Sequence, residues 1–176
     1  NFSLLDHGKF EPTNTNRQIF MYTDTDDFWK TEVTEQFIKK INPEVKVELY
    51  RQMTTENVGE FLRDTTVAVL AADAMVPIIL MSRKARELSI PLVEGWAVAY
   101  GNVRVFTDKT PSLEEVYNFP TIGRDIGEFT DEEQSEMLMK SIFEIAEIFP
   151  GITEHYSQDA LRKMQEEKIG TTLAPL

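Results

Sequence analysis

Apolar and polar residues recur along this chain with two different periods. Residues 31–41 repeat an apolar side chain every four positions, which is typical of one face of a helix, and Asn42-Pro43 ends that pattern. Residues 45–49 alternate apolar with charged side chains and predict a half-exposed strand. Residues 66–71 form an almost continuous apolar run, which predicts a strand buried on both faces of a sheet.

The alternation of helix-like and strand-like segments continues in the middle of the chain. We expect a short helix over residues 56–63, an amphipathic helix over residues 74–88 and a buried strand that begins near residues 91–93. Residues 100–106 contain a turn glycine followed by alternating valines, which indicates an antiparallel section. The predicted fold class is therefore α/β, with a mostly parallel sheet flanked by helices and an antiparallel extension.

The sequence changes character after residue 107. Residues 108–130 contain two prolines, two glycines and little periodicity, and predict a long loop or a partly ordered segment. Thr130-Asp131-Glu132-Glu133 is a capping box that opens a strong helix to about Phe149. A last charged helix is expected over residues 157–170, so that the chain ends in a helical segment.

Composition excludes several classes of function. The chain has 30 acidic and 18 basic residues and a net charge of −12, which argues against nucleic acid or an anionic membrane as a partner. It has no cysteine, which excludes disulfides, thiolate zinc sites and thioester chemistry, so no zinc is expected. It contains no apolar run long enough to span a bilayer and no signal peptide, and we expect a cytoplasmic protein.

A carboxylate follows the first predicted strand. Residues 3–5 have the character of a strand end, and Asp6 stands where that strand would stop. Ligands of open α/β sheets bind at the carboxyl ends of strands, and an ionised aspartate there can accept both hydroxyls of a ribose. The alternative interpretation is an aspartate that caps a turn.

Cations and amides lie close behind that carboxylate. The next loop carries Asn14, Asn16, Arg17 and Gln18. Lys30 then stands where a helical pattern begins, and Asp73 is a second acidic residue at a predicted strand end. Two cations beside an acidic strand end suit a polyphosphate, although they could also be a solvated surface pair.

In this order and spacing, the residues resemble the ThiF/MoeB/HesA adenylyltransferases, the bacterial relatives of ubiquitin-activating enzymes. The resemblance is carried by Asp6, Asn14-x-x-Arg17-Gln18, Lys30, Ile41-Asn42-Pro43, Ala72-Asp73, Ile90–Gly95 and Gly101–Phe106. Each motif alone is weak, and their common order makes the resemblance specific. It implies a Rossmann-like, partial nucleotide-binding domain over residues 1–107, with residues 108–176 as a loop and helical extension of the same domain.

The resemblance also implies roles for these residues. Asp6 would bind the ribose of ATP, Arg17 would contact the triphosphate, and Lys30 would stabilise charge on the α-phosphate. Asn14 and Gln18 would orient either phosphate or the loop.

Asp73 would hold the Mg²⁺ that bridges the phosphates. Its alternative role is that of a helix N-cap. Trp29, Trp96 and Tyr100 are expected to pack, and His7 and His155 are neither paired nor at metal spacing.

The implied reaction is adenylation of a carboxylate, in this family usually the C-terminal glycine of a ubiquitin-like sulfur-carrier protein. The products are an acyl-adenylate and pyrophosphate, and the family assembles as homodimers. The alternative is a non-catalytic scaffold or regulatory subunit that keeps the fold to bind a partner. Retention of Asp6, Arg17, Lys30 and Asp73 favours the enzyme.

Departures from the family pattern favour the scaffold. Gly8 stands where the family has a second acid, and Ala74 stands where it has an asparagine. The eight glycines form no G-x-G-x-x-G, so we expect the glycine-rich loop to precede Asn1, and the family's last helix to follow residue 176. The region after Phe106 lacks the cysteines of many relatives, which supports neither a structural zinc nor covalent sulfur transfer in this chain.

Overall fold

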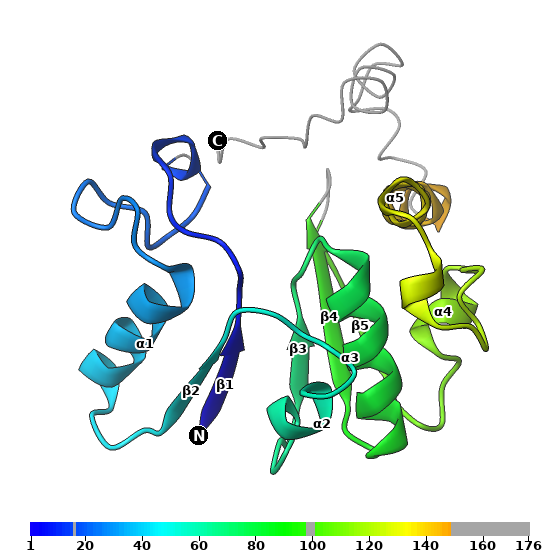
Figure 1. Cartoon of the computed structure of the whole chain (residues 1–176), viewed down its shortest axis with the longest axis horizontal. Coiled ribbons are helices and arrows are strands. Elements are labelled where there is room, and N and C mark those ends of the chain that lie inside the picture. The colour runs from blue at the N-terminus through cyan, green and yellow to red at the C-terminus, as the bar shows by residue number, and fades with distance from the viewer. Residues whose placement is uncertain (16, 98–100, 149–176) are drawn as a thin grey trace. The chain divides into compact units, whose positions relative to one another are not determined.

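The computed structural model describes residues 1–15, 17–97 and 101–148. The predicted helix over residues 157–170 lies outside the described residues, as do Asn16, Tyr100, His155 and the side chain of Trp96. The chain forms two compact units, of which the first contains Asn1–Met53 and the second begins at Thr54. Both contain strands and helices, and the predicted α/β class is confirmed (Figure 1). Within the described residues, no helix combines the length and the apolar character needed to cross a bilayer.

A two-stranded parallel sheet organises the first unit. Strand β1 (Phe2–Leu5) pairs with β2 (Val47–Tyr50), and Leu5 lies opposite Tyr50 at the carboxyl ends. The chain between them contains the 3-10 turn η1 (Pro12–Asn14) and helix α1 (Lys30–Ile41), which confirms the helix predicted over residues 31–41.

The apolar face of α1 is buried only at its N-terminal end. Val33 packs in a small core with Phe10 and Met21. Phe37 and Ile41, further along the predicted apolar face, are 45% and 72% exposed. The start of α1 is therefore the part that the packing of this unit holds in place.

The second unit contains a mixed sheet of three strands. Strand β3 (Ala68–Leu70) pairs in parallel with β4 (Leu92–Ala97). Strand β5 (Gly101–Phe106) runs antiparallel to β4, which confirms the predicted antiparallel section.

The described residues of the chain cover one face of this sheet and leave the other face exposed. Leu70, Leu92 and Phe106 are buried, whereas Val69, which points to the opposite face of β3, is 69% exposed. The prediction of a strand buried on both faces is therefore wrong for the described chain.

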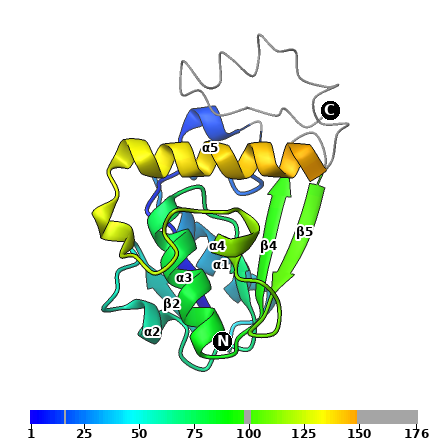
Figure 2. The same cartoon turned by 90° about the vertical axis from the view of Figure 1, so that its right-hand side faces the viewer.

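Three helices of the second unit match predicted ones. They are α2 (Val58–Phe61), α3 (Met75–Glu87) and α5 (Asp131–Ile148). Helix α3 supplies much of the core, because Ile78, Ile79 and Ala85 are almost fully buried. Helix α5 crosses α3 at a steep angle (Figure 2).

The loop predicted over residues 108–130 is an ordered and packed segment, so that prediction is wrong. It contains helix α4 (Leu113–Val116) and the 3-10 turn η2 (Ile126–Glu128). Ser112 and Glu115 form a capping box that starts α4, with the Ser112 N–H donating to Glu115 Oε2 at 2.6 Å. Buried Leu113, Tyr117, Phe119, Ile126 and Phe129 anchor the segment.

A charged pair joins this segment to α3. Arg83 donates to both carboxylate oxygens of Glu114, from Nε at 2.8 Å and from Nη2 at 2.7 Å. Thr121 Oγ1 also donates to Glu114 Oε1, at 2.5 Å, and the guanidinium donates to the carbonyl of Arg124 at 2.8 Å. The hydrogen bonds that the Glu114 carboxylate accepts from Arg83 hold the pKa of Arg83 above its ordinary value.

Removal of Arg83 should destabilise the second unit strongly. The Glu114 side chain is only 8% exposed, so Arg83→Met leaves a buried carboxylate without its cation. We expect a loss of about 2–4 kcal/mol in the free energy of unfolding. This loss is somewhat smaller than that expected for a fully buried ion pair, because the Arg83 side chain is 34% exposed. Urea denaturation measures the loss. The control is Arg63→Met, whose exposed pair with Glu60 at 4.0 Å should contribute less than about 1 kcal/mol.

Candidate functional site

Asp6 lies directly after β1, at the carboxyl end of the parallel pair. Its N–H donates to the carbonyl of Tyr50 at 3.3 Å, which extends the ladder by one residue. Its Oδ1 accepts a hydrogen bond from the N–H of Gly8 at 2.8 Å. Asp6 therefore caps a turn, and a carboxylate that accepts one hydrogen bond keeps further acceptor sites for a ligand.

The segment after Asp6 runs beside the start of α1. Lys9 and Trp29 form an antiparallel bridge, and the N–H of Phe10 donates to the carbonyl of Phe28 at 2.9 Å. The N–H of Lys30 donates to the carbonyl of Gly8 at 3.1 Å. These bonds place Lys30, the first residue of α1, beside the turn that Asp6 caps.

The Asp6 carboxylate and the Lys30 ammonium both approach Gly8 where a larger residue would carry its Cβ. A Cβ built on Gly8 would lie 3.1 Å from Asp6 Oδ1 and 3.2 Å from Lys30 Nζ, tighter than ordinary contact. Among the described residues, no carboxylate oxygen lies within 4.0 Å of Lys30 Nζ, so Lys30 forms no ion pair with them. The structure thus brings two predicted site residues, Asp6 and Lys30, to the same small space, which is open because residue 8 has no side chain.

The other predicted residues of the first unit lie in the loop around η1. Asn14 is buried, and its Oδ1 accepts from the N–H of Glu11 at 3.2 Å, so its amide orients the loop. Arg17 is exposed and donates from Nη1 to the carbonyl of Thr13 at 2.5 Å. Gln18 is half-buried, and its side chain forms no hydrogen bond with the described residues. Of the two amides, Gln18 is the better placed for a ligand.

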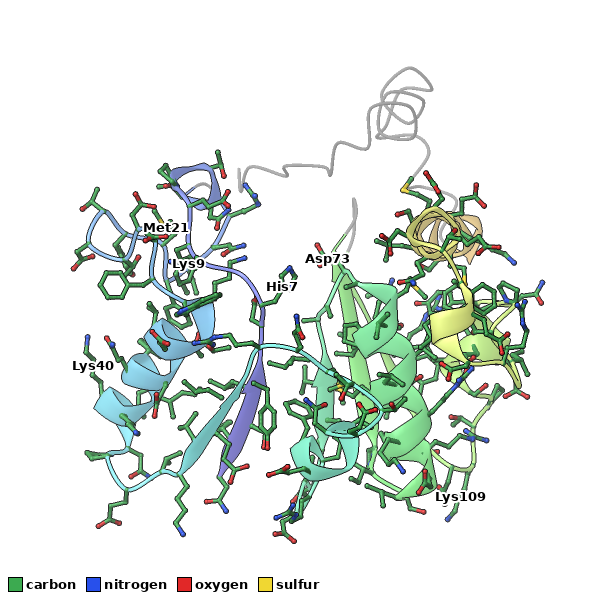
Figure 3. The ribbon with its side chains drawn as sticks, viewed as in Figure 1. His7, Lys9, Met21, Lys40, Asp73 and Lys109 are labelled. Atoms are coloured by element: carbon green, nitrogen blue, oxygen red, sulfur yellow. The ribbon has the colours of Figure 1, made fainter. Side chains whose placement is uncertain are left out.

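Asp73 lies in the second unit, after the end of β3 (Figure 3). It is exposed, and the N-cap of α3 is Ala74, without a side-chain hydrogen bond. The alternative interpretation of Asp73 as the helix N-cap is therefore wrong. The described residues contain no group of three potential metal-ligating side chains. A single exposed carboxylate still suits Mg²⁺, which keeps waters and binds phosphate oxygens as well.

Arg51 is a residue of this region that the sequence did not reveal. It directly follows β2, and its guanidinium carbon lies 4.4 Å from the centre of the Trp29 ring. The available sequence signal was its position two residues beyond the strand predicted over residues 45–49, whereas Asp6 directly follows the strand end predicted over residues 3–5. Its contacts with the start of α1 depend on tertiary packing and leave no sequence pattern.

Comparison with known proteins gives one family and a set of similar folds. The model of the ThiF family matches residues 1–171. A search of curated proteins finds no match. The solved structures that resemble this chain include Escherichia coli tRNA N6-threonylcarbamoyladenosine dehydratase, TcdA, in complex with ATP, at 22% identity and a TM-score of 0.56 over 94% of this chain and 76% of that one.

Two further structures have the same fold. PaaA is 21% identical, with a TM-score of 0.54 over 88% of this chain and 49% of its own. E. coli MccB with ATP is 20% identical, with a TM-score of 0.50 over 88% and 49%. The chain therefore spans about half the length of PaaA and MccB, and at these identities the likeness concerns the fold.

Gly8→Ala should displace the Lys30 ammonium without unfolding the protein. The added Cβ meets the Asp6 carboxylate and the flexible end of Lys30, and a shift of a few tenths of an ångström relieves both contacts, so stability should change by less than about 0.5 kcal/mol. Acetic anhydride labelling followed by mass spectrometry should show Lys30 more reactive relative to Lys40. The matched control is Gly59→Ala, where a Cβ has no neighbour within 4 Å. Unaltered labelling of Lys30 in Gly8→Ala would contradict the tight approach at Gly8.

Proposed function

This chain belongs to the ThiF family, and we propose that it forms part of an enzyme that adenylates a carboxylate with ATP. The observation that carries the proposal is that the Asp6 carboxylate and the Lys30 ammonium both approach Gly8, at the carboxyl end of two parallel strands. Ligands of open α/β sheets bind at such ends. A carboxylate acceptor, and an ammonium that forms no ion pair with the described residues, suit the two halves of a nucleotide, its ribose and its phosphates.

The proposed reaction joins the substrate carboxylate to AMP. A carboxylate oxygen attacks the α-phosphorus, the bond from that phosphorus to the bridging oxygen breaks, and pyrophosphate leaves with the bonding electrons. The products are an acyl-adenylate and pyrophosphate. A carboxylate is already ionised at pH 7, so the attack requires no general base. Positioning and neutralisation of negative charge supply the acceleration.

In this proposal each side chain has a defined task. Asp6 accepts hydrogen bonds from the ribose hydroxyls, and Lys30 stabilises the charge that grows on the α-phosphate oxygens. Arg17, exposed on its loop, contacts the triphosphate, and Gln18 donates its amide to a phosphate oxygen. Asn14 keeps the loop in shape.

Asp73 holds Mg²⁺ in the proposed complex. Its exposed carboxylate is a hard oxygen ligand, and the ion supplies further charge neutralisation at the phosphates when it is bound.

We propose as substrate the C-terminal carboxylate of a ubiquitin-like sulfur-carrier protein. The support is the family resemblance and the fact that MccB, of the same fold, has been crystallised with MccA. The chain has no cysteine, so this chain itself passes no sulfur and forms no thioester.

Exchange of labelled pyrophosphate into ATP tests this function. We expect the full-length protein to catalyse exchange when given a ubiquitin-like carrier that ends in glycine. Lys30→Ala and Arg17→Ala should each reduce exchange about 10²–10³-fold, because each removes a group that stabilises transition-state charge. Lys40→Ala is the matched control, since Lys40 is exposed at the other end of the same helix (Figure 3).

Two results would overturn the assignment. Undiminished exchange in Lys30→Ala removes Lys30 from the mechanism. Absence of exchange in the wild-type protein, together with tight binding of the carrier, identifies a binding module and not an adenylyltransferase.

A further inference from the structure

Trp29 is the residue at which two cations meet. The guanidinium carbon of Arg51 lies 4.4 Å from the centre of the Trp29 ring, and Lys9 Nζ lies 5.3 Å from it. Both distances fall within the range of cation–π interactions, and arginine also stacks on aromatic faces. Trp29 is the N-cap residue of α1, so whatever fixes its ring fixes the backbone immediately before Lys30.

Arg51 also binds the residues that follow Lys30. Its Nη1 donates to Thr31 Oγ1, and its Nη2 donates to Glu32 Oε1 at 2.6 Å. Thr31 is buried, which makes its hydroxyl a fixed acceptor. One guanidinium therefore contacts the residue before Lys30 and the two residues after it.

The turn after β1 also holds the Lys30 backbone. The Lys30 N–H donates to the carbonyl of Gly8, and Lys9 bridges Trp29. Arg51 leaves β2 one residue after Tyr50, and Asp6 leaves β1 one residue after Leu5, the partner of Tyr50. The start of α1 is thus fixed to the ends of both strands.

We propose that Arg51 is a positioning residue, which sets the location of the Lys30 ammonium through Trp29 and the first turn of α1. The effect of Arg51 on catalysis rests on the proposed function, whereas its effect on the position of Lys30 does not. Arg51 itself need not touch ATP. Its geometry requires an arginine, because a lysine offers no planar face to Trp29 and no fork to reach Thr31 and Glu32 together.

Loss of Arg51 should lower the rate of exchange more than the affinity for ATP. A displacement of about 1 Å in a catalytic group can cost as much as 10²-fold in rate. In the full-length protein we expect Arg51→Met and Arg51→Lys to reduce the maximal exchange rate about tenfold or more, with a much smaller change in the KM for ATP. Trp29→Leu should have the same effect, and Trp29→Phe, which keeps an aromatic face, should retain most of the rate.

A second measurement does not depend on activity. Acetic anhydride labelling should show Lys30 more reactive in Arg51→Met than in the wild type, with Lys40 as internal reference. Arg63→Met is the matched control, because Arg63 is exposed and its ion pair with Glu60 is 4.0 Å long. Circular dichroism establishes that each variant is folded, and Arg51→Lys takes the place of Arg51→Met if Arg51→Met does not fold.

The outcomes separate the two proposals. Increased Lys30 labelling in Arg51→Met supports the positioning role even if the wild-type protein shows no exchange, a result that would refute the adenylation alone. Normal labelling and a normal exchange rate in folded Arg51→Met and Arg51→Lys would refute the positioning role, even if Lys30→Ala is inactive. An equal loss of rate in Arg63→Met would refute it too.

Discussion

The parallel pairing of β1 with β2 is the constraint from which the candidate site follows. Because Leu5 lies opposite Tyr50, the next residues, Asp6 and Arg51, leave the sheet at the same edge. Asp6 caps the turn that contains Gly8, and Arg51 contacts the first turn of α1. A shift of one residue in this register would place one of these side chains on the opposite face of its strand. The Asp6 and Lys30 pair therefore depends on backbone pairing as much as on the two side chains.

Local patterns in the sequence were sufficient to predict most of the helices and strands. The four-residue period of α1, the capping box of α5 and the alternation in β5 each depend on neighbouring residues, and all three elements are confirmed. The order of the motifs along the chain was sufficient to identify the family. Residues 108–130 were misjudged because prolines and glycines outweighed a short signal, the Ser112 and Glu115 capping box.

Contacts between distant segments were beyond the reach of sequence patterns. The bond between Arg83 and Glu114 joins residues 31 positions apart, and Arg51 reaches Thr31 across 20 positions. No periodicity marks an arginine that will stack on a tryptophan. The sequence could place Asp6 and Lys30 near strand and helix ends, but it could not show that both approach Gly8 or that Arg51 contacts the Trp29 ring before the helix.

Gly8 bears on the choice between an enzyme and a scaffold. The resemblance leads one to expect an acid at this position, and its absence first suggests a lost site. Even the Cβ of a larger residue at position 8 would lie 3.1 Å from Asp6 Oδ1 and 3.2 Å from Lys30 Nζ, so an acidic side chain there would bring a second negative charge close to both groups. With glycine, Lys30 has no ion pair among the described residues and keeps its charge for an anion. The departure from the family pattern therefore leaves the Lys30 cation available to an anion such as phosphate, as the proposed function requires, and the loss of the acid does not by itself imply a lost site.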